Sequence, residues 1–298
     1  MITILGATGN VGGKIADILV KKGEHVRLVA RAANRLRQRV SKNVEAFAGD
    51  ALNAEFLAKA FKDADAVFTM IPPKPKADRF TDYADKMGQS IACALESAKV
   101  KHVVNLSSVG ADLAMGTGPI AGLHNQEERL NKIKGLNVLH LRPGTFMENL
   151  LMNVDLIRAK SVIGSPIRGD TRFPLIATKD IAAFAADCLV KKDFTGSSVR
   201  YLLGQRDLSM IEATEIAGWK INEPGLVYVM FPSDEAVKGF IAGGLSPDVS
   251  RLYVEMSRAF NEGRIKYEPR STGNTTPTSF EEFCEEVFVP VFTQKKAA

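Results

Sequence analysis

Three glycines near the start of the chain have the spacing of a phosphate-binding turn. Gly6, Gly9 and Gly12 follow a short apolar run (residues 2–5) that predicts a buried strand, and residues 14–22 carry apolar side chains at helical spacing. Glycine lets the backbone turn tightly between strand and helix, and the helix N-terminus favours phosphates. We therefore predict a dinucleotide site, although G-x-x-G-x-x-G differs from the dehydrogenase fingerprint G-x-G-x-x-G. A purely structural turn is the alternative.

The next predicted strand, His25–Ala30, ends at a cluster of arginines. An NAD site has an acidic residue near this point to bind the ribose hydroxyls, but Arg31 follows the strand and no Asp or Glu occurs before Glu45. A guanidinium can bind a 2′-phosphate through two hydrogen bonds, so the sequence predicts NADP(H) in preference to NAD(H). We expect Arg31 to make this contact, with Arg35 as the second candidate. Two or three of the four arginines in residues 31–39 would then form a solvated helix face.

Strands and helices alternate up to about residue 145, which predicts an α/β fold with a doubly wound parallel sheet of at least six strands. Beyond Gly144 the elements become shorter and richer in Gly and Pro. We predict a cofactor-binding domain at residues 1–145 and a smaller α+β substrate lobe at residues 146–298, interleaved with the sheet. Further predicted elements are the strands Val44–Asp50, Ala66–Pro73, His102–Ser108 and Asn137–Gly144, and the helices Ala54–Phe61, Phe80–Ala98, Asn125–Ile133 and Pro247–Asn261.

Ligands of such sheets bind at the carboxyl ends of the strands, which selects further candidate residues. Asp50 could accept a hydrogen bond from the adenine amino group, but an Asp at the end of a strand is as often a turn residue or a helix cap. Residues 69–71 offer apolar walls and backbone groups beside the nicotinamide ribose. Ser107 and Ser108 offer hydroxyls where a substrate carbonyl would sit, or else they cap the loop.

Composition and charge limit the classes of function. The chain has 298 residues, 45% of them hydrophobic, and a formal net charge of +5. This charge suits an anionic cofactor, but no aromatic residues interleave with a basic stripe, so we expect no nucleic-acid binding. Cys93, Cys188 and Cys284 lie far apart with no His at ligand spacing, so we expect buried thiols, a reducing compartment and no metal site. No apolar run reaches about 18 residues, so we expect a soluble, cytoplasmic protein that does not span a membrane.

Several motifs, taken in their order along the chain, resemble a known family. GATGNVGG at residues 6–13, the Arg after HVRLVA, the AGD, VVNLSSVGA at 103–111 and LRPGTFMENLL at 141–151 resemble the NmrA-like, atypical branch of the short-chain dehydrogenase/reductase superfamily. The similarity continues through FPLIATKDIAAFAADCL and YLLGQRDLSMIEATEI and covers roughly residues 1–220. It implies a Rossmann domain that binds NADP(H) and a small C-terminal substrate lobe.

The resemblance also implies roles for individual residues. The pyrophosphate would lie against Gly6, Thr8, Gly9, Asn10, Val11 and Gly12. The rest of the cofactor would lie against Arg31 at the 2′-phosphate, Asp50 and Ala51 at the adenine, and Thr69, Met70, Ile71 and Pro72 at the ribose and nicotinamide. From their positions in the sequence alone, we expect Arg35 and Ser107 to contact the cofactor as well. From the ends of the predicted strands, and not from the resemblance, we expect the substrate pocket to include Ser108, Val109 and Phe146.

The stretch from Pro119 to Gly135 departs from the wider superfamily. Catalytic members use Tyr-x-x-x-Lys on this helix, where the Tyr gives a proton to the carbonyl oxygen and the Lys lowers the pKa of that Tyr, but this stretch contains no Tyr. His124 and Glu128 stand one helical turn apart, and an imidazole can donate a proton near neutral pH, so they could form a substitute catalytic dyad. The alternative is that His124 begins the helix at the rim and Glu128 is a solvated helix residue.

Two functions from different classes fit these residues. The first is an NADPH-dependent reductase that passes hydride to a quinone or a similar flat electrophile. Such a reaction does not need a Tyr, because water can protonate the oxygens of the reduced quinone. The second is a non-catalytic NADP(H) redox sensor that regulates a protein partner. The substantial lobe after Gly144 favours the reductase, and a homodimer fits either function. Met147, Phe173 and Trp219 either line an apolar substrate pocket with Phe146 or belong to the core.

Overall fold

Residues 1–294 are described by the computed structural model, and a seven-stranded sheet lies at their centre. All neighbouring strands of this sheet run parallel. The chain builds outward from β1 in two directions, so the strand order reverses between β1 and β4. In spatial order the strands are β10 (Ser197–Leu202), β6 (Asn137–Pro143), β5 (His102–Leu106), β4 (Ala66–Thr69), β1 (Ile2–Leu5), β2 (Val26–Ala30) and β3 (Val44–Ala48).

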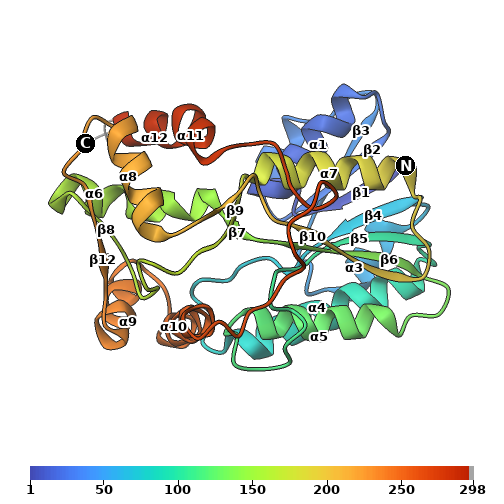
Figure 1. The fold of residues 1–298 in the computed structure, drawn as a ribbon. Helices are drawn as coiled ribbons and strands as arrows, with labels where there is room; N and C mark the ends of the chain where they lie inside the picture. Colours follow the sequence, from blue (N-terminus) through green and yellow to red (C-terminus); the bar gives the residue numbers. More distant parts are fainter. Residues whose placement is uncertain (295–298) are drawn as a thin grey trace.

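Helices cover both faces of the sheet (Figure 1). α1 packs against α7 on one face, while α4 packs between α3 and α5 on the other. The expected doubly wound α/β fold of the Rossmann type is thereby confirmed. These helices are α1 (Asn10–Lys21), α2 (Ala33–Arg37), α3 (Ala54–Phe61), α4 (Phe80–Ser97), α5 (Ile120–Asn131) and α7 (Thr178–Lys191).

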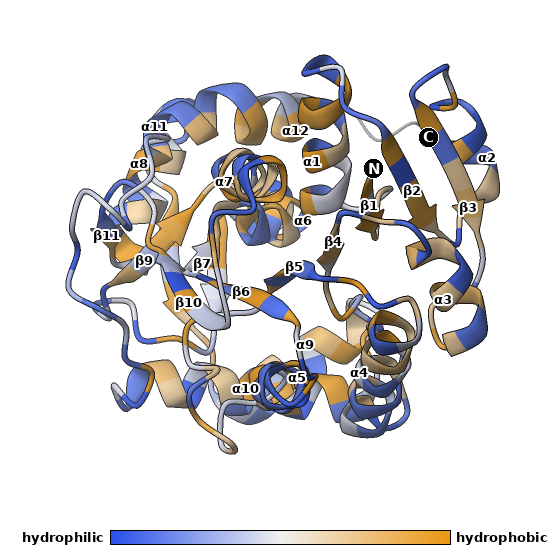
Figure 2. Ribbon diagram, turned by 90° about the vertical axis from the view of Figure 1, so that its right-hand side faces the viewer, coloured by the Kyte–Doolittle hydropathy of each residue, from blue (hydrophilic) through white to orange (hydrophobic). Residues whose placement is uncertain are grey.

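The strands at the centre of the sheet are buried on both faces, because helices cover both. Every residue of β1, β2 and β4 is buried. Figure 2 shows mainly hydrophobic residues along these strands and hydrophilic residues on the outer sides of the helices. Ile15 and Leu19 of α1, one helical turn apart, are both fully buried. A near-continuous apolar run thus forms a strand, and apolar side chains at helical spacing form the inner face of a helix.

Shorter elements of the second half of the chain lie beside the carboxyl ends of the strands (Figure 1). They have a hydrophobic core of their own, in which the ring centroids of Phe173 and Phe260 are 5.5 Å apart. The strands there are β7 (Thr145–Phe146), β8 (Val162–Ser165), β9 (Phe173–Ile176), β11 (Asp207–Leu208) and β12 (Val227–Met230). The helices there are α6 (Val154–Lys160), α8 (Met210–Lys220), α9 (Ser233–Ala242), α10 (Pro247–Asn261), α11 (Phe280–Phe283) and α12 (Val289–Thr293), with a 3₁₀ turn at Met147–Asn153 and a π turn at Cys284–Phe288.

One strand of the second half belongs to the central sheet. β10 pairs with β6 at the edge of that sheet, so residues after 145 contribute to both parts of the molecule. The boundary at residue 145 stays a prediction. Within residues 1–294 no helix is both long and apolar enough to span a bilayer. The cytoplasmic location also stays a prediction.

The start of α5 differs from expectation. The helix begins at Ile120, whereas the sequence predicted a start at Asn125. Gly122 gave the appearance of a loop, but it lies inside the helix, where a Cβ would be 3.0 Å from the Ala84 Cβ of α4. Glycine is therefore present because α4 and α5 approach closely, and His124 does not begin the helix.

Two expectations about buried side chains were wrong. Cys93 on α4 is exposed, whereas Cys188 is partly buried and Cys284 is buried. Burial raises the pKa of the Cys284 thiol to about 12, so this thiol stays protonated. Trp219 at the end of α8 is 71% exposed, so it belongs neither to the core nor to an enclosed pocket.

Candidate functional site

The glycine turn connects β1 to α1 at the carboxyl edge of the sheet. Gly6 has a φ of +76°, which glycine adopts freely and other residues rarely do. The N–H groups of Gly6 and Ala7 donate to the carbonyl of Val29, which fixes the turn to β2. A Cβ on Gly12 would lie 2.5 Å from the Gly6 carbonyl oxygen, so glycine at position 12 lets α1 begin close against the turn.

The start of α1 presents backbone donors without partners. Gly9 precedes the helix and has no side chain to cap it. Among the residues that the structure describes, nothing accepts a hydrogen bond from the N–H groups of Thr8, Asn10, Val11 and Gly12. Such donors, at the positive end of a helix dipole, form an anion site. The turn therefore fits the pyrophosphate of a dinucleotide.

The side chain of Asn10 links α1 to the start of α7. Its Oδ1 accepts a hydrogen bond from Lys14 Nζ and lies 3.1 Å from the Thr178 hydroxyl. That hydroxyl also contacts Glu148, whose carboxylate accepts the Thr178 N–H at 3.1 Å. Glu148 thereby caps α7, which has no side-chain cap of its own. Because only the Oδ1 atom of the Asn10 side chain is engaged, its backbone N–H and its Nδ2 are the groups left to bind a phosphate.

The arginines after β2 fall into two groups. Arg39 donates to the Ala7 carbonyl at 2.9 Å and pairs with Asp17, so it supports the glycine turn. Arg31 and Arg35 are exposed, and the described part of the chain offers neither side chain a hydrogen bond or an ion pair. An unpaired guanidinium beside a phosphate-binding turn is free to bind a ligand.

Asp50 follows β3 and forms a local turn. Its Oδ1 accepts the Leu52 N–H at 3.0 Å, while Asn53, not Asp50, caps α3 by accepting the Phe56 N–H. The turn role anticipated as an alternative is therefore present. It leaves Oδ2 of the exposed carboxylate for a ligand. The carbonyl of Ala51 accepts the Ser90 hydroxyl at 2.7 Å, which ties this segment to α4.

The end of β4 lies against the glycine turn. The Thr69 side chain is fully buried and its hydroxyl donates to Asn105 at 3.1 Å, so only its backbone can face a ligand. Met70 packs beside Gly6, where an added Cβ would lie 2.9 Å from the Met70 sulfur. Ile71 is buried, and Pro72 is partly buried. The expected cofactor contacts of these four residues stay predictions.

Sequence reasoning missed two residues at this edge, Tyr83 and Lys74. The Tyr83 hydroxyl donates to the Pro72 carbonyl at 2.9 Å, and Lys74 Nζ lies 5.0 Å from the Tyr83 ring centroid. The available signal was helical spacing, because Tyr83 stands three residues after Phe80 and four before the buried Met87 on α4.

The Ser107 hydroxyl at the end of β5 is directed into a buried ion pair. It donates to Glu127 of α5, and Glu127 pairs with Arg142 of β6 at 2.6 Å. Arg142 also donates to the Tyr201 hydroxyl at 3.0 Å. Burial acts to lower the pKa of Arg142, but the hydrogen bonds and the charge of Glu127 raise it above its usual range. A contact between Ser107 and the cofactor stays a prediction, and its hydroxyl has a protein acceptor already.

The three residues expected in the substrate pocket have different surroundings. Ser108 is half-buried in the loop after β5, and Phe146 is half-buried on β7. Val109 is fully buried in the core of the second half of the chain, and its N–H donates to the Pro143 carbonyl. Ser108 and Phe146 therefore keep some surface for a substrate, whereas the side chain of Val109 does not.

His124 and Glu128 lie on α5 without contacting one another in the part of the chain that the structure describes. His124 Nδ1 is 2.9 Å from the Ala111 carbonyl oxygen in the loop after β5. Glu128 is exposed and lines a groove of about 410 Å³ between α4 and α5. The substitute dyad stays a prediction, and this placement of Glu128 gives it no geometric support.

A buried polar chain crosses the sheet behind the ligand edge. Thr69 donates to Asn105, whose amide lies 3.1 Å from His140 Nδ1, and His140 Nε2 lies 2.9 Å from Asn131 Oδ1. Burial lowers the pKa of His140 to about 4, so the imidazole is neutral at pH 7. This chain provides hydrogen-bond partners for Thr69, Asn105 and His140, which are all buried.

Comparison with known proteins identifies a family and a shared fold. The NAD(P)H-binding family matches residues 6–192. An NAD(P)H azoreductase from Xenophilus azovorans is 26% identical over 291 residues, which cover 96% of this chain and 97% of that protein. The NADPH complex of an NADPH-dependent quinone oxidoreductase from Escherichia coli has a TM-score of 0.79 at 18% identity, over 97% of this chain and 100% of that chain. A Citrobacter triphenylmethane reductase with NADP(H) has a TM-score of 0.81 at 17% identity, over 96% and 99%.

The fold and the glycine turn define an NAD(P)-binding protein of the Rossmann type. The family match covers more than half of the sequence, so the chain belongs to the NAD(P)H-binding family. The expected resemblance to NmrA-like, atypical short-chain dehydrogenases is confirmed at this level.

Proposed function

We propose that this protein is a reductase that prefers NADPH to NADH and passes hydride to a quinone or a similar flat electrophile. The observation that carries the proposal is the unpaired Arg31 at the end of β2, beside a turn whose backbone N–H groups have no acceptor among the described residues. The relatives support a flat acceptor, since those named above are an azoreductase, a quinone oxidoreductase and a triphenylmethane reductase.

In this proposal, the different parts of the cofactor lie at the ends of different strands. The backbone N–H groups at the start of α1 bind the pyrophosphate, and the adenosine extends over the ends of β2 and β3. Arg31 and Arg35 bind the 2′-phosphate, while Asp50 and Ala51 face the adenine. Residues 69–72 then border the ribose and nicotinamide. Residues 1–145 hold the cofactor, and residues 146–298 close the acceptor pocket.

The proposed reaction needs no acid from the protein. NADPH supplies the hydride when bound. The side chains orient a flat acceptor and exclude water, with Ser108 and Phe146 partly exposed at the pocket. α5 contains no Tyr, and the Ser107 hydroxyl donates to Glu127. A reduced quinone takes its protons from water, so neither feature prevents turnover.

The experiment is to mix the protein with NADPH and a panel of quinones and azo dyes while following the absorbance of the reduced nicotinamide. We expect acceptor-dependent loss of absorbance with at least one flat acceptor. Simple aliphatic ketones should give none, because their carbonyl needs the proton that a Tyr would donate. Turnover of ketones alone would contradict the proposal.

A redox sensor is the second candidate function. The absence of Tyr from α5 fits it equally well. A sensor would bind NADPH tightly and show no turnover above background across the whole panel, and a regulated protein partner would then be expected. The same assay therefore separates the two functions.

A further inference from the structure

The loop between β4 and α4 carries a cluster that the function proposed above does not use. The Tyr83 hydroxyl donates to the Pro72 carbonyl at 2.9 Å, which fixes the loop where it leaves the sheet. Lys74 Nζ lies 5.0 Å from the Tyr83 ring centroid, within cation–π range. This loop therefore places a lysine over an aromatic ring at the ligand edge of the sheet.

The far side of the same loop is fixed by the start of α10. The Pro75 carbonyl accepts the Ser246 N–H at 2.8 Å, and the Ala77 carbonyl accepts the Ser246 hydroxyl at 2.5 Å. Prolines within residues 72–75 further restrict the backbone. Lys74 thus extends from a backbone that is held on both sides. Ligand binding at Lys74 therefore costs little entropy for ordering the loop.

Two charged residues from neighbouring strands act on the same tyrosine. Burial raises the pKa of Tyr83, while the charge of Arg31 acts to lower it and the charge of Asp50 acts to raise it. β2, β3 and β4 are parallel strands of one sheet, so Arg31 after β2 and Asp50 after β3 stand at the same edge as the loop after β4. Both are residues that the proposed function places at the adenosine end of the cofactor.

Two cations at this edge of the sheet, Arg31 and Lys74, are not paired with carboxylates in the described part of the chain. Within residues 1–294, neither Arg31 nor Lys74 forms a hydrogen bond or an ion pair with a carboxylate. Two unpaired cations at the same edge of the sheet repel, and an anion bound between them offsets that repulsion. A phosphate monoester carries a charge of about −1.5 to −2 at pH 7, which suits two cations better than one.

We propose that Lys74 is a second cationic ligand of the 2′-phosphate of NADPH, opposite Arg31, and that Tyr83 is the residue that positions it. The inference rests on the proposed function, because it needs NADPH at the glycine turn. Tyr83 acts through its ring, which lies under Lys74, and through its hydroxyl, which holds the Pro72 carbonyl.

The test is to titrate Lys74→Ala with NADPH and with NADH, using Lys76→Ala as the matched control. Lys76 is an exposed lysine of the same loop and makes no side-chain contact among the described residues. By nicotinamide fluorescence, Lys74→Ala should lose roughly tenfold or more in NADPH affinity and keep its NADH affinity, as for the loss of one charge-assisted contact. Lys76→Ala should bind both cofactors as the unchanged protein does.

Two further measurements sharpen the test. Titration with 2′,5′-ADP and with 5′-AMP should show the same contrast without a nicotinamide, because only the first carries a 2′-phosphate. Tyr83→Phe keeps the ring and loses the hydroxyl, so it should weaken NADPH binding less than Tyr83→Leu, which also removes the ring. Thermal unfolding of each variant confirms that it is folded.

Equal NADPH affinities for Lys74→Ala and Lys76→Ala would overturn the inference, and so would an equal loss for 2′,5′-ADP and 5′-AMP. Arg31→Ala separates this failure from a failure of the proposed function. If Arg31→Ala loses NADPH affinity selectively while Lys74→Ala does not, only the role of Lys74 is wrong. If the unchanged protein binds NADH as tightly as NADPH, the proposed preference fails as well.

Discussion

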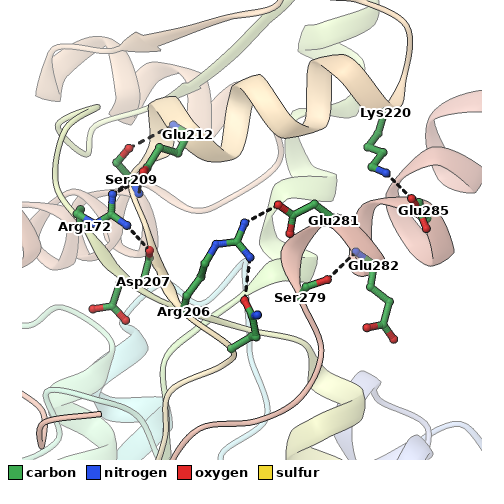
Figure 3. A network of polar contacts seen from close by, with 11 residues as sticks. Arg172, Arg206, Asp207, Ser209, Glu212, Lys220, Ser279, Glu281, Glu282 and Glu285 are labelled. Atoms are coloured by element: carbon green, nitrogen blue, oxygen red, sulfur yellow. Dashed lines mark hydrogen bonds and ion pairs between the residues drawn. The ribbon is translucent and has the colours of Figure 1, made fainter.

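Cationic side chains have different surroundings in the C-terminal lobe and at the ligand edge of the sheet. In the lobe, the cations around α8 and α11 form ion pairs, as Figure 3 shows: Arg172 with Glu212, Arg206 with Glu281 and Lys220 with Glu285. At the ligand edge, Arg31, Arg35 and Lys74 are among the cations without a carboxylate partner in the part of the chain that the structure describes.

We infer from this difference that the paired cations stabilise the fold and that Arg31 and Lys74 bind the cofactor. Arg27 on β2 and Arg31 just after this strand show the difference. Arg27 is buried, pairs with Glu45 and donates to the carbonyls of Ala60 and Lys62, so the protein satisfies its guanidinium. Arg31 follows the same strand and is exposed without a partner in residues 1–294. We therefore expect changes at paired cations to alter stability, and changes at the unpaired Arg31 and Lys74 to alter cofactor affinity.

The largest expected effect tests the paired class. Arg142→Ala leaves the buried Glu127 without its cation, and an unpaired buried charge costs about 3–5 kcal/mol of unfolding free energy. Urea unfolding should show this loss, while the ratio of NADPH to NADH affinity stays unchanged in the folded fraction. If the variant unfolds like the unchanged protein but has an altered ratio of NADPH to NADH affinity, the distinction between paired and unpaired cations is wrong.

Acid should destabilise the sheet through His140. Its folded pKa of about 4 lies below the usual 6.5, so the unfolded chain binds the proton more tightly. Stability should therefore fall as pH decreases from 6.5 to about 4, by at most about 3.5 kcal/mol at roughly 1.4 kcal/mol for each pH unit. Urea unfolding across this range measures the slope, and His140→Gln should flatten it. An unchanged slope in that variant would assign the effect to other groups.

Arg31→Ala tests the unpaired class. Losing one charge-assisted phosphate contact should weaken NADPH binding by about 1.5–3 kcal/mol and leave NADH binding nearly unchanged. The unfolding free energy should not change, because Arg31 makes no ion pair in the described structure. Arg37→Ala, another exposed arginine of the same segment, is the control. Equal losses for both cofactors would argue against a 2′-phosphate contact.

The smallest effect is expected for Arg172→Ala in the lobe. Its pair with Glu212 is exposed, and exposed ion pairs contribute about 0–1 kcal/mol. The Ser209 backbone and Arg172 together hold the pKa of Glu212 at about 2, so this contribution should be present above pH 4.5 and be lost as pH falls from there toward about 2. Thermal unfolding at pH 7 and at pH 3 measures it. A change in cofactor preference in this variant would contradict the division between the two regions.

Locally encoded features of the fold could be predicted from the sequence. The bounds of α3 and α10 match the predicted helices Ala54–Phe61 and Pro247–Asn261. Asn53 and Ser246 stand at the N-caps of these helices, where local side-chain bonds define the start. The glycine turn was predictable for the same reason, because its spacing sets its own backbone geometry.

Features that depend on distant partners could not be predicted. Ser107 looked like a ligand residue because it ends a strand, but Glu127 reaches its hydroxyl from α5. Tyr83 and Lys74 meet only because the loop folds back over α4. The early start of α5 depends on the close approach of Gly122 to α4. The contacts of Ser107 and Gly122 lie outside the window in which a sequence pattern can be recognised. The contact of Lys74 with Tyr83 lies inside that window, but it depends on a loop conformation that has no periodic pattern.

The central claim is that an unpaired Arg31 commits the glycine turn to NADPH as the hydride donor for a flat acceptor. The most direct measurement is the quinone-dependent oxidation of NADPH and of NADH by the unchanged protein and by Arg31→Ala, expressed as kcat/KM for each cofactor. The account predicts faster oxidation of NADPH by the unchanged protein and loss of that preference in Arg31→Ala. Quinone-dependent turnover with the same preference in both proteins, or no turnover at all, would contradict it.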